Sequence, residues 1–234
     1  NGLKTVLIEK DKLGGTCLNR GCIPTKTLVS VAHLLCSLKR AGDFGINISR
    51  YELSLEKVRN RKDEIVSSLI QGIAFLMKKN KIMVIEGRAD VEEEGLLSVE
   101  GRTEKIRYKN LILATGSLPN TLPIPGADAP DIFDSDTLLE LAGIPETLAI
   151  IGGGVIGMEL AFIYSAFGSK VHVIEYLPQI LNFLDRDAAA VIKRSAKKNN
   201  INIIESAKVI RIDSTPEGKK IVTFERNGKE ESIT

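Results

Sequence analysis

The sequence predicts an α/β protein with two similar halves, in which parallel strands alternate with helices. Three observations support this fold class. A buried strand, a glycine-rich turn, a helix and a second strand follow one another at residues 147–175. The sequence of that second strand, residues 169–175, resembles residues 3–9 near the start of the chain. Five prolines between residues 118 and 145 mark a connector between the two halves.

Residues 147–175 have the order of a dinucleotide-binding unit. Residues 147–151 are apolar and short enough for a buried strand, and the glycine motif of residues 152–157 follows at once. Residues 158–167 have a helical pattern that stops at Gly168, and residues 170–175 predict a strand ending in an acid. A glycine motif alone is weak evidence, but the complete order indicates a Rossmann-like site.

Each position of this unit has a mechanical role. Gly152 permits the tight turn, Gly154 lets a pyrophosphate approach the backbone, and Gly157 lets helix and strand pack closely. The pyrophosphate would lie at the helix N-terminus, and the acid would accept hydrogen bonds from a ribose 2′-hydroxyl. No arginine between residues 176 and 185 could favour a 2′-phosphate, so NAD is expected rather than NADP. The predicted NAD-binding residues of the unit are Gly152, Gly154, Val155, Ile156, Gly157 and Glu175.

Residues 14–26, GGTCLNRGCIPTK, contain two closely spaced cysteines, Cys17 and Cys22. A structural zinc site needs about four ligands, and Cys36 and the two histidines have no ligand spacing to this pair. A structural disulfide suits small secreted domains better than this chain. Pro24 favours the first turn of a helix, which places Cys22 just before a helix N-terminus that stabilises a thiolate. A redox-active pair is the interpretation that fits.

The cysteine segment resembles the redox disulfide motif of the FAD-dependent pyridine nucleotide-disulphide oxidoreductases. Its sequence Leu-Asn-Xaa-Gly-Cys-Ile-Pro is most similar to that of the dihydrolipoamide dehydrogenase branch. The resemblance implies that Cys17 exchanges with the substrate, that Cys22 lies nearest the flavin, and that dihydrolipoyl groups are oxidised with reduction of NAD through FAD. Mercuric or glutathione reductase is an alternative, and so is a non-catalytic nucleotide-binding piece of such an enzyme.

The resemblance also assigns residues to the cofactors. Glu9 would bind the FAD ribose at the end of a strand, and Lys26 would lie near the reactive edge of the flavin. Glu159 would lie on the nicotinamide side, or it is a surface glutamate of its helix. The residues assigned to FAD are Glu9, Lys10, Gly15, Thr16, Lys26, Ala89, Thr115, Gly116 and Ser117.

The expected organisation is a partial FAD-binding domain at residues 1–120, a connector at 121–143 and an incomplete NAD-binding domain at 144–234. Each domain would have three layers, with a parallel central sheet and an antiparallel β-meander. By resemblance, a first strand with its glycine motif would precede residue 1, and a dimerisation domain would follow residue 234. The complete protein would be a homodimer acting on the lipoyl group of a 2-oxoacid dehydrogenase or glycine cleavage complex, and this piece alone is expected to be inactive.

The composition excludes other classes of function. A net charge of +2 over 234 residues, with lysines spread among acids, gives no basis for nucleic-acid binding. No run approaches the roughly 18 apolar residues of a membrane span, and no metal site is expected. A cytoplasmic location is therefore predicted.

Hydrophobic periodicity predicts the remaining elements. A long helix at residues 53–80 would bury one apolar stripe. Strands are expected at residues 82–89, 201–204, 208–212 and 221–224, with a helix at 187–199. The stripe consists of Leu55, Val58, Ile65, Leu69, Ile73, Leu76 and Met77.

Overall fold

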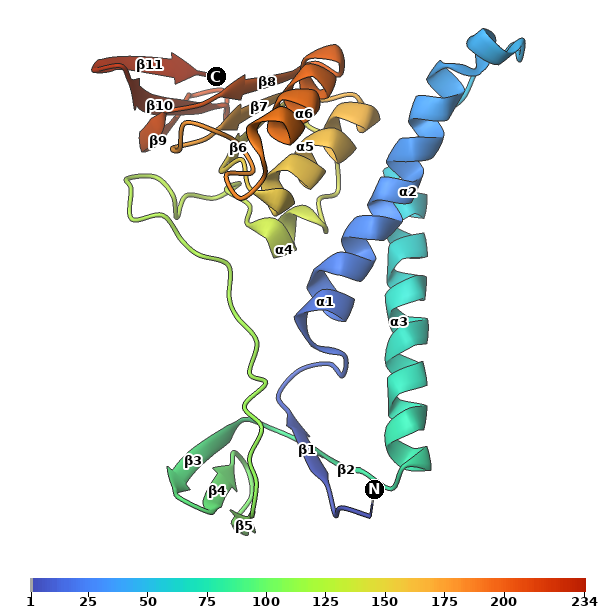
Figure 1. The fold of residues 1–234 in the computed structure, drawn as a ribbon, viewed down its shortest axis with the longest axis vertical. Helices are drawn as coiled ribbons and strands as arrows, with labels where there is room; N and C mark the ends of the chain where they lie inside the picture. Colours follow the sequence, from blue (N-terminus) through green and yellow to red (C-terminus); the bar gives the residue numbers. More distant parts are fainter. Residues whose placement is uncertain (1) are drawn as a thin grey trace. The chain divides into compact units, whose positions relative to one another are not determined.

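The computed structural model describes residues 2–234, which form two compact units (Figure 1). Unit 1 consists of the chain up to Pro24 together with Lys62–Leu118, and unit 2 consists of Thr25–Arg61 and Pro119–Thr234. Helices α2 (Cys22–Lys39) and α3 (Leu55–Lys79) each contribute residues to both units. The domain limits near residues 120 and 144 stay predictions.

Unit 1 holds two small sheets. β1 (Val6–Glu9) pairs in parallel with β2 (Met83–Glu86). The predicted strand at 82–89 extends too far at its C-terminal end, because β2 stops at Glu86. Gly87 has a φ of +143°, and the chain leaves the sheet there. The antiparallel second sheet has the order β3-β4-β5, and its elements are β3 (Ala89–Glu93), β4 (Leu96–Val99) and β5 (Ile106–Arg107).

Unit 2 has three layers built on a parallel sheet in the order β6-β7-β8 (Figure 1). Helices α5 and α6 cover one face of this sheet, and the antiparallel meander β9-β10-β11 covers part of the other. The α/β fold class, with its parallel sheet and meander, is therefore confirmed. The elements are β6 (Thr147–Ile151), α5 (Val155–Phe167), β7 (Lys170–Ile174), α6 (Arg186–Lys198), β8 (Ile201–Ile204), β9 (Lys208–Ser214), β10 (Lys220–Arg226) and β11 (Lys229–Ile233).

The alternation of side chains along β7 and β8 explains this layering. Val171 and Val173, both 0% exposed, belong to the core cluster shared with α5 and α6. Ile174 and Ile204 belong to a second cluster with Phe224 of the meander. Because successive side chains of a strand point to opposite faces, the two clusters lie on opposite sides of one sheet.

The proline-rich connector is anchored within unit 2 at both of its ends. The Ile212 amide of β9 donates to the carbonyl of Pro125 at 2.9 Å. Further on, Asp134 caps the short helix α4 (Ser135–Leu138), and the Tyr164 hydroxyl of α5 donates to Leu138 O at 2.7 Å. Burial raises the pKa of Tyr164 to about 12, so this hydroxyl keeps its proton and its bond near neutral pH. The connector therefore has fixed contacts to α5 and β9.

The apolar stripe of α3 is only partly buried. Val58 is 7% exposed and belongs to the core of unit 2, whereas Leu69 and Leu76 are 41% and 47% exposed. The prediction that the whole stripe is buried is wrong for these two leucines. Periodicity identifies the apolar face of a helix, but burial needs a partner element. No core cluster of residues 2–234 includes either leucine.

One helical stretch, Gly15–Lys39, is long and apolar enough to meet the length and composition requirements of a membrane span. Helices that line a protein core meet the same requirements. Leu28, Ala32 and Leu35 of this stretch are buried in the core of unit 2. In the apolar 18-residue window of this stretch 28% is buried, so packing inside the protein accounts for only part of its hydropathy.

Candidate functional site

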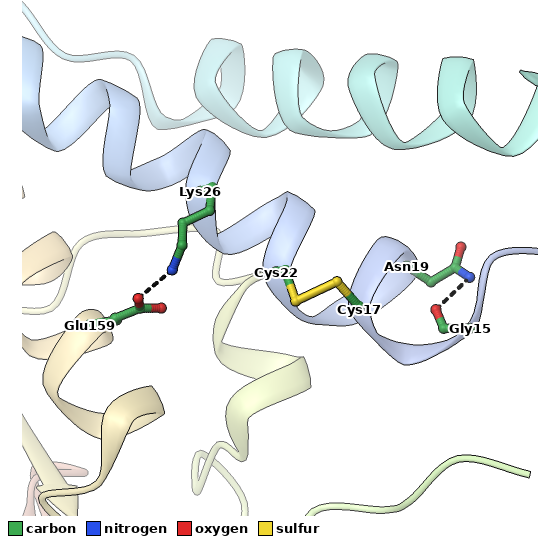
Figure 2. Close-up of a disulfide and its surroundings, with 6 residues drawn as sticks. All are labelled: Gly15, Cys17, Asn19, Cys22, Lys26 and Glu159. Carbon is green, nitrogen blue, oxygen red and sulfur yellow. Dashed lines mark hydrogen bonds and ion pairs between the residues drawn. A yellow bond between two sulfur atoms is a disulfide. The ribbon is translucent and has the colours of Figure 1, made fainter. Parts of the chain in front are cut away.

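The two cysteines of the predicted redox motif form a disulfide (Figure 2). Cys17 lies in the short helix α1 (Gly15–Arg20), Cys22 is the first residue of α2, and their Cα atoms are 4.7 Å apart. A Cβ at Gly21 would lie 3.1 Å from Cys17 Cα, so glycine permits this close approach. The prediction that Cys22 precedes the helix is wrong by one residue. Cys22 still lies in the first turn of α2, where the helix dipole favours a thiolate.

The loop before α1 has a backbone that only glycine adopts easily. Gly14 and Gly15 have φ values of +112° and +68°. The Asn19 side chain donates to the carbonyl of Gly15 at 3.0 Å (Figure 2). It also donates to the carbonyl of Leu13 at 3.1 Å, which holds the loop against the helix. The segment that carries Cys17 is therefore preformed.

Lys26 and Glu159, both within unit 2, form an ion pair (Figure 2). Lys26 lies on α2, one helical turn after Cys22, and Glu159 lies on α5, two residues after Gly157 of the glycine motif. The side chains are 56% and 33% exposed, so the pair is accessible to solvent. The sequence indicated a cofactor role for each residue, but it did not predict that they pair.

The glycine motif at the N-terminus of α5 fits a dinucleotide. Gly152 has a φ of +107°, and a Cβ on Gly157 would collide with the Gly152 carbonyl oxygen. A Cβ on Gly154 would meet no atom within 4 Å, which leaves the backbone of that residue open. Val155 and Ile156 are exposed at the helix start. The loop thus presents accessible backbone at a helix N-terminus, the arrangement that binds pyrophosphate.

The Glu175 carboxylate lies at the carboxyl end of β7, beside the glycine loop. Its Oε2 accepts a hydrogen bond from Gly153 N–H at 2.6 Å, and its Oε1 accepts one from Leu177 N–H at 2.7 Å. Each carboxylate oxygen has a second lone pair, which a ribose hydroxyl could use. The structure therefore places Glu175 where the sequence predicted it and adds a direct bond to the loop.

Except for Lys26, which lies in unit 2, the residues assigned to FAD lie in unit 1. Glu9 is the last residue of β1, and its carboxylate accepts from the Asp11 amide at 2.9 Å. Gly116 has a φ of +75°, and its Cβ would lie 3.2 Å from Thr16 Oγ1, so residues 115–117 pass close to the redox loop. These residues fit the edge of a flavin nucleotide site. The remaining assigned residues, Lys10, Ala89, Thr115 and Ser117, are exposed.

Sequence reasoning missed residues that hold the glycine loop of residues 152–157 in place. The backbone of Gly153 is bonded on both sides, by Glu175 and by Leu181 N–H at 2.9 Å. Glu205 in turn accepts from Ile180 N–H at 2.8 Å. Gly153 occupies an unspecified position of the motif, and Glu205 is distant in sequence, so no local pattern identified them.

Fold and site together define a dinucleotide-binding disulfide oxidoreductase. The family model "Pyridine nucleotide-disulphide oxidoreductase" matches residues 1–233, so the chain belongs to that family. Enzymes of the family use FAD and NAD(H), which confirms the two predicted cofactors at the level of the family.

Curated relatives support the predicted branch. The chain is 40% identical to a dihydrolipoyl dehydrogenase of Bacillus subtilis (strain 168) over 218 residues, which cover 92% of this chain and 48% of the relative. It is 38% identical to the dihydrolipoyl dehydrogenase of Acholeplasma laidlawii over 237 residues, covering 99% of this chain and 68% of the relative. The chain spans about half the length of most of these curated relatives.

Solved structures share the fold. The HOCl-induced flavoprotein disulfide reductase RclA from Escherichia coli matches with a TM-score of 0.82 and 31% identity, over 99% of this chain and 49% of that one. LpdA from Mycobacterium tuberculosis matches with a TM-score of 0.87 and 24% identity, over 99% of this chain and 51% of that one, and at that identity it supports the fold alone.

Proposed function

We propose that this chain is the redox and NAD-binding portion of a dihydrolipoyl dehydrogenase. The observation that carries the proposal is the Cys17–Cys22 disulfide at the start of α2. The similarity to dihydrolipoyl dehydrogenases over most of the chain supports the choice of substrate. The substrate would be the dihydrolipoyl group of a 2-oxoacid dehydrogenase or glycine cleavage complex.

The disulfide would be the electron acceptor for the substrate dithiol. A substrate thiolate attacks Cys17 Sγ, a mixed disulfide forms, and Cys22 leaves as a thiolate that the N-terminus of α2 stabilises. The second substrate thiolate then attacks the mixed disulfide, which closes the lipoyl disulfide and releases Cys17 as a thiolate. The substrate loses two electrons, and the cysteine pair gains them. When bound, FAD and NAD would supply the hydride chemistry that reoxidises the pair.

NAD is the proposed dinucleotide rather than NADP. In this proposal Glu175 would accept hydrogen bonds from the ribose, and its negative charge would repel a 2′-phosphate. Segment 176–184 contains no arginine to bind such a phosphate. A homodimer, a cytoplasmic location and the absence of membrane and nucleic-acid partners belong to the same proposal, supported by the family resemblance and by the composition.

The test uses the full-length protein and three cysteine variants. Cys17→Ser and Cys22→Ser should each abolish NADH formation from dihydrolipoamide and NAD. Cys36→Ser is the matched control, because Cys36 lies on the same helix but is not disulfide-bonded, and it should keep full turnover. Full turnover in Cys22→Ser would overturn the disulfide mechanism.

A panel of substrates distinguishes the rival function. The rival function is that of a different flavoprotein disulfide reductase, which the 31% identity to RclA supports. Mercuric and glutathione reductases are the alternatives that the sequence motif leaves open. Wild-type activity with glutathione disulfide or Hg(II) and none with dihydrolipoamide would replace the proposed function by this second one.

A further inference from the structure

The segment between β7 and α6, residues 176–184, lies directly against the glycine loop. Leu181 N–H donates to Gly153 O at 2.9 Å, and the Ile180 side chain is 0% exposed. A Cβ on Gly153 would lie 2.5 Å from Ile180 Cγ2, so the loop and the segment are packed without a gap. The position of the Gly153 peptide is therefore set by the positions of Ile180 and Leu181.

Glu205, just after β8, holds this segment from its other side. Its Oε1 accepts from Ile180 N–H at 2.8 Å, and its two oxygens lie 3.3 and 3.0 Å from the Lys193 ammonium of α6. The next residue, Ser206, donates its amide to Leu177 O at 3.0 Å. The Glu205 side chain is 20% exposed, and this partial burial strengthens its hydrogen bond and its ion pair.

The segment needs such an anchor because its backbone is strained. Leu181 has a φ of +49°, a left-handed conformation that costs a residue with a Cβ on the order of 1 kcal/mol or more. This conformation aims its amide at Gly153 O. If the Ile180 amide were released, the turn could relax and withdraw its bond from the glycine loop.

We infer that Glu205, oriented by Lys193, is a positioning residue for dinucleotide binding. It acts through Ile180 and Leu181 on Gly153, and so it presets the backbone amides that receive the pyrophosphate. The inference rests on the proposed function, because it assumes that NAD binds at the N-terminus of α5. Preorganisation of this kind lowers the ordering cost of binding and leaves the chemical step unchanged.

The test compares four variants of the full-length protein. Glu205→Ala removes the acceptor of the Ile180 amide, whereas Glu205→Gln keeps an amide oxygen in its place, and Lys193→Met removes only the orienting charge. Arg211→Gln is the matched control, because Arg211 forms an exposed ion pair with Asp213 on the meander.

Glu205→Ala should raise the Kd for NADH and the KM for NAD about tenfold, which corresponds to about 1.4 kcal/mol. Its kcat and its KM for dihydrolipoamide should stay within about twofold of the wild type, since Glu205 acts on NAD binding alone. Lys193→Met should have an intermediate effect, Glu205→Gln should restore most of the affinity, and Arg211→Gln should match the wild type. Equal NADH affinity in Glu205→Ala and the wild type would overturn the inference. Equal increases in the KM for NAD and the KM for dihydrolipoamide would overturn it as well.

Hydrogen exchange without nucleotide gives an independent measurement. The Gly153 and Leu181 amides should exchange faster in Glu205→Ala than in the wild type, while the amides of the meander should not change. Unchanged exchange at Gly153 would overturn the inference. A wild-type protein that turns over dihydrolipoamide with another acceptor and has no affinity for NADH would overturn the NAD assignment as well. If every variant instead binds NADH as tightly as the wild type does, only the inference about Glu205 is overturned and the NAD assignment stands.

Discussion

Glu9 and Glu175 end two strands of similar sequence and begin the same kind of turn. Each carboxylate accepts a hydrogen bond from the amide two residues further on, Asp11 at 2.9 Å and Leu177 at 2.7 Å. The similarity of residues 3–9 and 169–175 thus extends to local structure. The same short sequence pattern with an acid at its end therefore occurs with the same local hydrogen bond in both places.

The two acids differ in what else they contact. Glu175 also accepts from Gly153 at 2.6 Å, which joins the end of β7 to the loop after β6. Within residues 2–234, the Glu9 carboxylate has the Asp11 amide as its hydrogen-bond partner, and β1 pairs with β2 alone. Glu175 therefore has a structural role in addition to any ligand role, whereas in the described residues Glu9 is free to act as a ligand. Substitutions that separate folding from nucleotide binding test this difference.

The largest expected effect is at Gly157, which lets α5 pack on the loop that Glu175 holds. A Cβ there would collide with the Gly152 carbonyl, and both groups are backbone, so Gly157→Ala should cost about 3 kcal/mol. The measurement is the thermal midpoint of the full-length protein with and without NAD. Gly154→Ala, whose Cβ meets no atom within 4 Å, should keep the apo midpoint and lose NAD affinity. Equal apo midpoints for the two variants would contradict this account.

The second prediction tests the two acids directly. Glu175→Ala removes a charged acceptor from two amides, one of them part-buried, and should destabilise the apo protein by about 2 kcal/mol. Glu9→Ala removes one exposed bond and should cost less than about 1 kcal/mol. Thermal midpoints of both variants without cofactors would show the difference. If the two midpoints fall equally, the bond to Gly153 adds no stability.

The sequence predicts the β6–α5–β7 unit almost to the residue. The strand at 147–151 matches β6, and the helix stop at Gly168 matches the end of α5, where Gly168 has a φ of +120°. These features follow from local periodicity and from glycine conformations, which a sequence displays directly. The turn into β11 was missed although its signal is present: Asn227 and Gly228 have φ values of +54° and +72°, as in a two-residue hairpin loop.

Contacts between distant residues could not be predicted in this way. The pairs Lys26–Glu159 and Glu205–Ile180 join elements far apart in the chain, and no spacing rule connects them. Exposure of Leu69 was missed for the same reason, because the helix pattern contains no information about its partner. Local chemistry predicted which residue types form the site, and tertiary packing determines which of them touch.

Asp134 is a third carboxylate that accepts hydrogen bonds from backbone amides, and it lies outside the proposed nucleotide sites. Its substitution tests whether such bonds stabilise the protein there. Hydrogen bonds from the Thr137 amide and hydroxyl lower the pKa of Asp134 below 3.8. The ionised Asp134 side chain therefore contributes its full stabilisation of the folded protein above about pH 4. This contribution is lost as the pH falls through the lowered pKa. Asp134→Ala should cost about 1 kcal/mol at pH 7. Its thermal midpoint should approach that of the wild type as the pH falls through the lowered pKa of Asp134. A difference that persists undiminished at low pH would exclude the charged cap as its cause.

The smallest effect on stability is expected for Glu159, whose partner is a side chain rather than a backbone amide. Lys26 is 56% exposed, and pairs of this kind contribute about 0.5 kcal/mol, so Glu159→Gln should barely change the thermal midpoint. We expect turnover to fall by about tenfold or more, because Glu159→Gln removes the charge that orients the Lys26 ammonium. Glu56→Gln on α3 is an exposed control that should change neither quantity. A loss of stability comparable to that of Glu175→Ala, with turnover unchanged, would show that the pair holds α2 to α5 and does not serve catalysis.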